Sequence, residues 1–166
     1  MALLQILKYP DSRLYTVAAP VAQVDDAVRA LVDDMAATMY AAPGIGLAAT
    51  QVNVHKQVIV MDISESKDQL LVLINPEITK WDGYEMGREG CLSVPDYTGN
   101  VIRANNIVLQ AFDQHGERHE YEMEGFEARA VQHEIDHLDG LLFLDRVVSR
   151  RSDIFKRKVY KKPGKQ

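Results

Sequence analysis

The segment His133-Glu134-Ile135-Asp136-His137 constrains this chain more than any other. Residues four apart lie on one face of an α-helix, so a helix here places the imidazoles of His133 and His137 within reach of a single cation. Glu134 then lies beside them, where a carboxylate can accept a proton from water held near a metal. The pattern predicts a helix in the second half of the chain that carries part of a hydrolytic metal site.

Two histidines do not complete such a site, because a hydrolytic metal is normally held by three protein ligands and keeps one open position. One zinc-peptidase pattern places the third ligand six residues after the second histidine, but Phe143 occupies that position. Another pattern uses a downstream Glu, and no Glu follows Glu134. The third ligand therefore lies upstream, or is one of the few later Asp residues.

Cys91 is the only cysteine of the chain and stands in a short apolar stretch between Gly90 and Pro95. A single thiol cannot form an internal disulfide, and the first residues lack the pattern of a secretory signal, so we expect it to stay reduced. A thiolate is a strong ligand for zinc and ferrous iron. A cysteine alone is more often a small buried hydrophobe. Beside an HExxH motif without a third partner, ligation is favoured, which predicts a site of Cys91, His133 and His137.

Three separated blocks of the sequence belong together. They are Gly44-Ile45-Gly46-Leu47-Ala48-Ala49-Thr50-Gln51, then Glu89-Gly90-Cys91-Leu92-Ser93, then Gln132-His133-Glu134-Ile135-Asp136-His137. In this order and spacing they resemble the peptide deformylases, a match far more specific than HExxH or a glycine-rich run alone. The resemblance extends from Leu4 to about Asp145. It implies an enzyme that removes the formyl group from the N-terminal methionine of newly made polypeptides and releases formate.

The resemblance also implies a role for each site residue. The three ligands would hold one divalent metal ion, and their donor atoms suit Fe(II), Zn(II), Ni(II) and Co(II); ferrous iron is the physiological metal that the resemblance implies. Glu134 would move a proton from water to the leaving amine. Gln51 and the backbone N–H of Leu92 would donate to the carbonyl oxygen of the substrate.

The first block has a separate physical role. Glycine lets a backbone approach a ligand closely, so Gly44, Ile45 and Gly46 are predicted to pair with an extended peptide substrate along one edge of the site. A phosphate-binding loop is the alternative, but no Lys-Ser/Thr pair follows, and the apolar continuation offers little to a phosphate. We therefore favour the peptide-binding interpretation.

The chain departs from the common family pattern near the expected substrate side-chain pocket. Gly87 and Arg129 stand where many peptide deformylases carry apolar residues, and Arg129 lies one helical turn before His133. We predict that Arg129 is a substrate-binding residue and that the preference for formyl-methionine is altered or relaxed. Glu89 is predicted to pair with Arg103 or Arg129 and to hold its loop. For Asp136, support of the site is favoured over ligation.

A length of 166 residues suits one domain with one core. Apolar spacing predicts helices over 24–40 and 125–137, the second with Gly140 as its stop. Strands are predicted over 58–61 and 70–74, the latter ended by Asn75-Pro76, and a hairpin from 107–112 and 118–123. Together these elements predict a single-domain α+β fold, with mainly antiparallel sheet around an HExxH helix in the C-terminal half.

Charge is distributed unevenly along the chain. Residues 150–166 carry eight basic residues and one acid, whereas the other 149 residues carry eleven basic and twenty-three acidic ones. We therefore divide the chain into a catalytic domain, 1–148, and a basic C-terminal tail, 149–166, for which the resemblance implies contact with the ribosome. No apolar run approaches membrane-spanning length. A cytoplasmic location is expected, with formyl-Met-starting nascent peptides as partners and neither membrane nor DNA.

Two other functions fit parts of the pattern. An HExxH metallopeptidase would cleave internal peptide bonds with the same water chemistry, but its downstream Glu or His ligand is missing here. A metal-stabilised binding module without catalysis would need the ligands but not Glu134. Substitution of Glu134 separates these classes, because an enzyme should lose catalytic turnover while keeping its metal, whereas a binding module should be unaffected.

Overall fold

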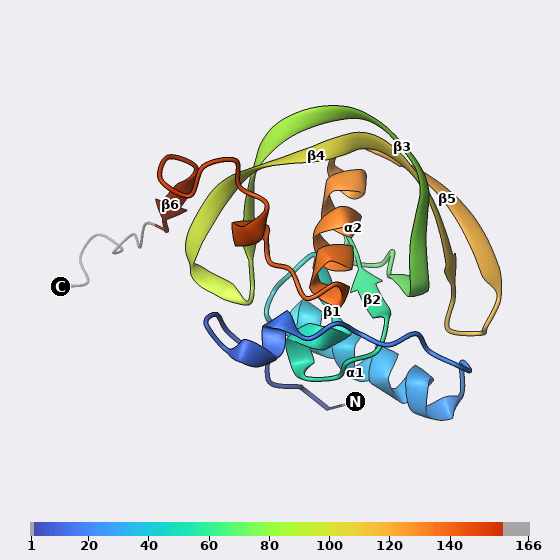
Figure 1. Cartoon of the computed structure of the whole chain (residues 1–166). Helices are drawn as coiled ribbons and strands as arrows, with labels where there is room; N and C mark the ends of the chain where they lie inside the picture. Colours follow the sequence, from blue (N-terminus) through green and yellow to red (C-terminus); the bar gives the residue numbers. More distant parts are fainter. Residues whose placement is uncertain (1, 158–166) are drawn as a thin grey trace.

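The structure is a computed structural model that describes residues 2–157 (Figure 1). The helices are α1 (Asp26–Ala41) and α2 (Gly125–Leu138), and short 3-10 turns are η1 (Ser12–Tyr15), η2 (Ala49–Val52) and η3 (Phe143–Asp145). The strands are β1 (Gly46–Ala48), β2 (Val58–Met61), β3 (Leu71–Cys91), β4 (Val94–Phe112), β5 (Arg118–Glu124) and β6 (Ile154–Lys156). The single-domain α+β prediction is confirmed.

The strands form one sheet in the order β1-β2-β3-β4-β5, and β6 pairs with β4. Every pairing between these strands is antiparallel. The long strands β3 and β4 arch over α2, while α1 lies on the far side of β1 and β2 (Figure 1). The sheet therefore curves around α2 and restricts the orientation of the HExxH side chains that this helix carries.

Helix α1 forms where its apolar spacing predicts. Asp25 caps its first turn by accepting a hydrogen bond of 3.0 Å from the backbone N–H of Val28. Its buried face packs on β1 and β2, and is made of Val28, Val32, Met35 and Met39. These positions follow the helical repeat, so the face supports the sheet from behind.

The prediction that Asn75-Pro76 ends a strand was wrong. Strand β3 continues to Cys91, because a bulge between Ile74 and Glu77 absorbs the irregular residues without breaking the pairing with β4. Asn75 has φ 52° there, and its side chain accepts a hydrogen bond from the backbone N–H of Val21 and donates one to the carbonyl of the same residue. A bulge accommodates Pro76, because proline has no N–H to donate to the hydrogen bonds of a regular strand pair.

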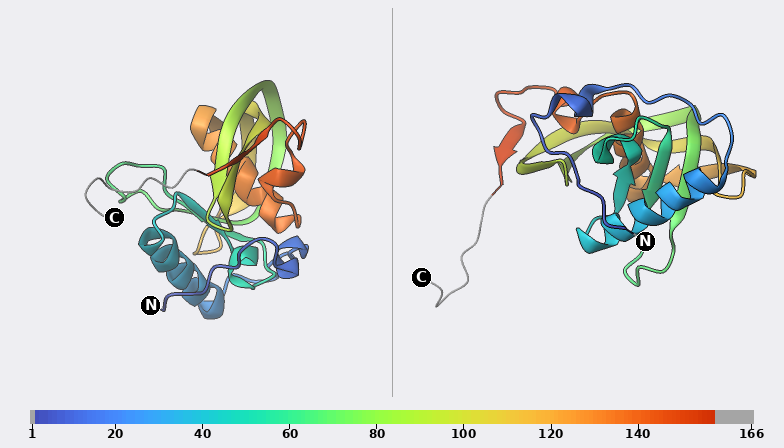
Figure 2. Two further views of the ribbon diagram at one scale, coloured as in Figure 1. Left: turned by 90° about the vertical axis from the view of Figure 1, so that its left-hand side faces the viewer. Right: turned by 90° about the horizontal axis from the view of Figure 1, so that it is seen from below.

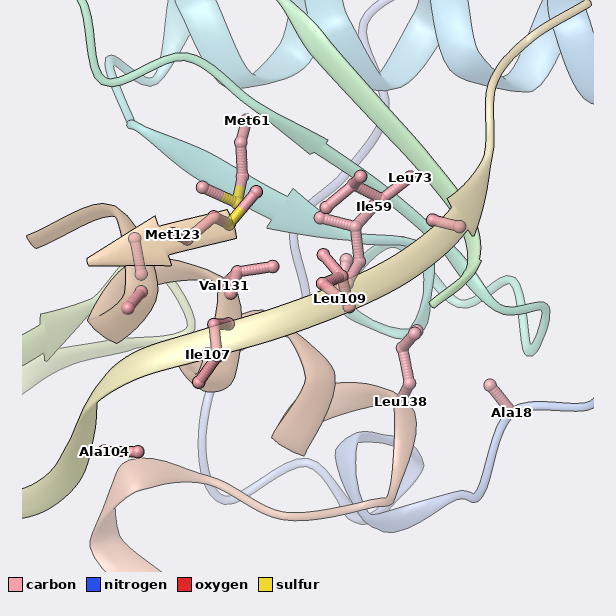
Figure 3. Close-up of a cluster of buried hydrophobic side chains, with 14 residues drawn as sticks. Ala18, Ile59, Met61, Leu73, Ala104, Ile107, Leu109, Met123, Val131 and Leu138 are labelled. Carbon is pink, nitrogen blue, oxygen red and sulfur yellow. The ribbon is translucent and has the colours of Figure 1, made fainter. Parts of the chain in front are cut away.

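The core lies between α2 and the concave face of the sheet (Figure 3). Val131 and Leu138 of α2 belong to the same buried cluster as Ile59 of β2, Leu73 of β3 and Leu109 of β4. Full burial of one such side chain stabilises a fold by roughly 1.5–3 kcal/mol. Packing from three strands therefore fixes the rotation of α2, and with it the direction in which the HExxH side chains point.

The end of the described chain returns to the sheet. Strand β6 pairs with residues 97–99 of β4, beside the closed end of the β3–β4 hairpin (Figure 2). The division at residue 148 stays a prediction, and residues 158–166 of the predicted tail lie outside the described residues. Neither helix in the described part of the chain has the length and apolarity needed to span a membrane.

Candidate active site

The predicted metal ligands come from two elements. His133 and His137 lie on α2, and Cys91 is the last residue of β3, where a tight turn over Leu92 and Ser93 leads into β4. Helix α2 begins at Gly125, which has φ +58°, and the chain leaves it through Gly140 at φ +76°, as predicted for its stop. The arch of β3 and β4 thus brings the end of a strand next to the buried turn of α2 that carries the two histidines.

The three ligand side chains converge. Sγ of Cys91 lies 3.3 Å from Nε2 of His137, and the ligand atoms of Cys91, His133 and His137 all lie within 4.8 Å of one another. Both histidines are buried, whereas Cys91 is partly exposed. One soft thiolate and two imidazoles at this separation fit a single Fe(II) or Zn(II) ion with a position left open toward solvent.

Glu89 orients His133 from behind. The Nδ1–H of His133 donates to the Glu89 carboxylate over 3.0 Å, which leaves Nε2 to face a cation. Arg103 and Arg129 also donate to Glu89, at 2.9 and 2.7 Å, so the predicted pairing holds for both arginines. Burial would raise the pKa of Glu89, but the hydrogen bonds from His133 and Arg103 outweigh it and lower the pKa to about 2.

Asp136 points to a different face of α2 and extends the same network. It accepts hydrogen bonds from Arg103 and, at 2.9 and 3.1 Å, from Arg146. Arg103 therefore bridges Asp136 and Glu89, and all three side chains are buried. These contacts agree with the predicted supporting role of Asp136, and this buried ion network ties β3, β4 and the region after α2 to His133.

Burial and neighbouring charges shift the pKa values of the two histidines in opposite directions. Desolvation, together with the charges of His133 and Arg103, lowers the pKa of His137 well below its usual range, so its imidazole is neutral as a ligand must be. For His133 burial alone would lower the pKa, but the charge of Cys91 and its hydrogen bond, with Glu134 and Glu89, raise it. A metal that binds at His133 must therefore displace a proton.

Glu134 is buried and lines the same cleft as Cys91 and Gln51. Burial is the main cause that raises its pKa to about 7, in a range suited to taking up and releasing a proton at neutral pH. Its Oε1 atom has no hydrogen-bond partner among the described residues. A Cβ on Gly46 would lie only 2.7 Å from Oε2, so glycine at that position leaves the carboxylate its space.

Gln51 presents its amide to the thiol. Its carbonyl oxygen accepts a hydrogen bond of 2.9 Å from the backbone N–H of Ala48, which fixes which end of the amide faces the site. Its Nε2 then donates to the hydroxyl of Ser93 at 3.0 Å and to Sγ of Cys91 at 3.6 Å. The first and second sequence blocks meet through this side chain.

These residues share one cleft of about 380 Å³. It is lined by nine of the predicted site residues, which are Gly44, Ile45, Gly46, Gln51, Cys91, Leu92, Arg129, His133 and Glu134. His137 is the tenth, and it is almost fully buried beside Cys91. The structure therefore brings all ten residues that were predicted as catalytic, metal-binding or substrate-binding to one place.

Sequence reasoning missed five residues that also line the cleft, and three of them have large side chains. Phe126 extends from the first turn of α2, Arg88 lies on β3 one residue before Glu89, and Arg157 follows β6. The position of Arg88 beside the second block was a usable signal. Nothing local pointed to Arg157, because only the pairing of β6 with β4 carries it back to the site.

Comparison with known proteins agrees with this geometry. The family model described as "Polypeptide deformylase" matches residues 3–153. Peptide deformylase 1 of Pseudomonas syringae pv. tomato is 54% identical over 162 residues, which cover 97% of this chain and 96% of that protein. Peptide deformylase of Pseudomonas aeruginosa is 50% identical over 167 residues, covering 100% and 99%.

Solved structures give the same answer for the fold. The crystal structure of a peptide deformylase from Legionella pneumophila has a TM-score of 0.87 and 41% identity, over 90% of this chain and 89% of that one. That from Thermotoga maritima has a TM-score of 0.85 and 36% identity, over 90% and 100%. Because the family model and these relatives each span nine-tenths or more of its sequence, the chain belongs to the polypeptide deformylase family.

Proposed function

We propose that the cleft hydrolyses the formamide at the N-terminal methionine of newly made polypeptides, with Cys91, His133 and His137 holding one divalent metal ion. Membership of the family makes the chain a hydrolase that removes N-formyl groups. The observation that carries the residue assignment is the convergence of a thiol and two imidazoles within 4.8 Å, next to a cleft that Gln51 and Glu134 also line.

Ferrous iron is the metal that we propose for this site. A thiolate with two imidazoles accepts Fe(II) as well as Zn(II), Ni(II) or Co(II), so the donor set alone allows all four. When bound, the ion supplies Lewis acidity and lowers the pKa of water at the site. A thiolate next to ferrous iron is prone to oxidation, so activity should be lost in air unless zinc or nickel replaces the iron.

The side chains then have distinct tasks. Glu134 accepts a proton from the attacking water and delivers it to the nitrogen that leaves, so the C–N bond breaks to give formate and a free amine. The amide of Gln51 and the backbone N–H of Leu92 donate to the carbonyl oxygen as negative charge develops on it. Loss of one such donor typically costs roughly 3 kcal/mol of transition-state stabilisation.

The substrate backbone has an edge to bind. Strand β1 is the first strand of the sheet, and only β2 pairs with it among the described strands. Gly44, Ile45 and Gly46 lead into this strand and line the cleft. An extended peptide can therefore add to the outer edge of β1, with its formylated end directed at the metal ligands.

Arg129 shapes the side-chain pocket as a fixed wall. Its guanidinium donates to Glu89, to the carbonyl of Val101 at 2.9 Å and to the carbonyl of Glu85 at 2.6 Å. A Cβ on Gly87 would lie 2.8 Å from its Cζ, so the glycine makes room for the arginine. We propose that this Gly87–Arg129 pair alters or relaxes the preference for formyl-methionine.

Location and partners follow as further proposals. A cytoplasmic location is proposed because members of the family act on nascent peptides. Contact of the basic C-terminal tail with the ribosome is proposed from its charge and from the resemblance to the family. Removing residues 158–166 should then weaken co-sedimentation with ribosomes without changing the hydrolysis of short peptides.

The test of the proposed function is release of formate from formyl-Met-Ala-Ser. Protein loaded with Fe(II) under strict exclusion of oxygen should release formate, and the same sample after removal of the metal by a chelator should not. Reloading with Fe(II) or Ni(II) should restore the activity. An N-acetylated peptide of the same sequence is the control for general amidase or peptidase activity. No formate from metal-loaded protein, or equal activity without metal, would contradict the proposal.

A further inference from the structure

Two arginines stand at the mouth of the cleft, away from its buried floor. Arg88 and Arg157 both line the cleft and are exposed. Neither forms an ion pair with an acid in the part of the chain that the structure describes, whereas Arg129 is paired with Glu89. The mouth therefore carries two positive charges that the fold itself does not neutralise.

Arg88 is held in place by neutral groups. Its guanidinium lies 3.7 Å from the centre of the Phe155 ring, a stacking contact that β6 provides. Its Nε donates to Oδ1 of Asn100 at 3.2 Å, and a terminal nitrogen lies 3.4 Å from the hydroxyl of Thr98. These contacts orient the guanidinium without cancelling its charge.

Arg157 is placed by the strand that precedes it. Its backbone N–H donates to the carbonyl of Asp96 at 2.8 Å, immediately after β6. Its guanidinium crosses Gly90, where a Cβ would lie 2.6 Å from Nη2. The side chain therefore lies directly over the residue that precedes the ligand Cys91, and Gly90 leaves the space that it occupies.

Nearby acids do not offset these charges. In the cleft, Glu89 is buried and held by Arg103 and Arg129, and Glu134 is buried at the floor. Asp153, near the start of β6, is engaged by Asn100 and by the backbone N–H of Ser149. Among the described residues neither guanidinium has a carboxylate partner, so both are available to an anionic ligand at the mouth.

We propose that Arg88 and Arg157 form a carboxylate-binding subsite that favours formylated peptides with an acidic side chain downstream of the formylated residue. This inference rests on the proposed function, because the peptide must leave the metal ligands along the cleft. An extended chain advances by about 3.3 Å per residue, so a side chain one to three residues downstream reaches the mouth. Guanidinium groups bind carboxylates in a directional, charge-assisted way.

The experiment scans one acidic side chain along the substrate. The peptides are formyl-Met-Glu-Ala-Ala, formyl-Met-Ala-Glu-Ala and formyl-Met-Ala-Ala-Glu, each with a partner in which Gln replaces Glu. For the wild type we expect kcat/KM to be about fivefold higher for Glu than for Gln at one of these positions, as two exposed ion pairs suggest. That ratio should shrink as salt rises from about 0.05 to about 0.5 M.

Variants assign the effect to the two arginines. Arg88→Gln and Arg157→Gln should each reduce the Glu/Gln ratio, and the double variant should bring it to about one. Arg151→Gln is the matched control, because Arg151 is an exposed arginine of the same segment that does not line the cleft. It should leave the ratio unchanged. Since the ratio compares two substrates of one protein sample, partial unfolding of a variant does not affect it.

The outcomes separate this subsite from the function itself. Equal rates for Glu and Gln peptides at all three positions would overturn the subsite and leave the deformylase activity standing. Persistence of the preference in the double variant would likewise overturn the assignment to Arg88 and Arg157. Absence of formate from every peptide, Gln series included, would overturn the proposed function and the subsite with it.

Discussion

Replacing Glu134 with Gln is expected to lower kcat for formate release by about three orders of magnitude while the protein keeps its metal ion. Positioned general bases typically contribute 10²–10⁴-fold, and the glutamine has nearly the same shape but cannot take up a proton. Glu134 is buried, Gly46 leaves its carboxylate space, and its pKa of about 7 matches the task. Because Glu134 is not a ligand, binding of the metal should survive.

The measurement is the steady-state rate with metal content matched by elemental analysis. Glu127→Gln is the control, because Glu127 lies on the same helix and does not line the cleft. It should retain the wild-type rate. An unchanged rate in the Glu134 variant would remove Glu134 from the mechanism and favour a binding module that merely contains a metal. Parallel loss of metal and activity would assign Glu134 a structural task instead.

Replacing Arg103 with Met is expected to have the largest effect on stability. Arg103 is buried and donates to both Glu89 and Asp136, so its removal leaves two buried carboxylates short of a partner. Removing one partner of a buried ion pair typically costs 3–5 kcal/mol. Arg129 and Arg146 still hold one carboxylate each, so we expect a loss of about 3 kcal/mol in the free energy of unfolding.

The same substitution should also lower the affinity of the site for its metal ion. Glu89 orients His133, and loss of such an orienting contact typically lowers metal affinity by 10–100-fold. Urea unfolding and a competition assay with a chromophoric chelator measure the two effects. Arg150→Met is the control, because Arg150 makes an exposed pair with Asp145 that should contribute less than about 1 kcal/mol. Wild-type stability and metal affinity in the Arg103 variant would show that the network does not support the site.

The parts of the fold that the sequence predicted are those with a local signal. The face of α1 has a helical repeat of buried residues, and the HExxH motif fixes both the type of α2 and the proximity of His133 and His137. Cys91 was predicted as the third ligand because it is the one cysteine of the chain and neither a Glu nor a His stands at the downstream positions that known patterns use. Gln51 and Leu92 had no signal of their own and came from the resemblance to a family.

The long β3–β4 hairpin had no such signal. The second half of β3, from about Lys80 to Arg88, is mostly exposed, so it shows no alternation of apolar and polar residues. The sequence Asn75-Pro76 is typical of a strand end, and only the pairing with β4 turns it into a bulge. The structure of this segment depends on its pairing with β4, and a short stretch of sequence does not contain that information.

The mouth of the cleft was hidden for the same reason. Arg157 lies in a basic C-terminal segment whose sequence is typical of a solvent-exposed tail. It is placed at the site only by the pairing of β6 with β4. Arg129 was predicted as a substrate-binding residue from its place on the helix. Its hydrogen bonds to the carbonyls of Glu85 in β3 and Val101 in β4 depend on parts of these strands that the sequence did not predict.

X-ray absorption at the zinc edge of zinc-loaded protein shows whether Cys91, His133 and His137 together hold one metal ion. We expect one sulfur at about 2.3 Å and two imidazole nitrogens at about 2.0–2.1 Å. In Cys91→Ser protein the sulfur shell should disappear. A spectrum without sulfur in the wild type, or one that Cys91→Ser leaves unchanged, would contradict the three-ligand site.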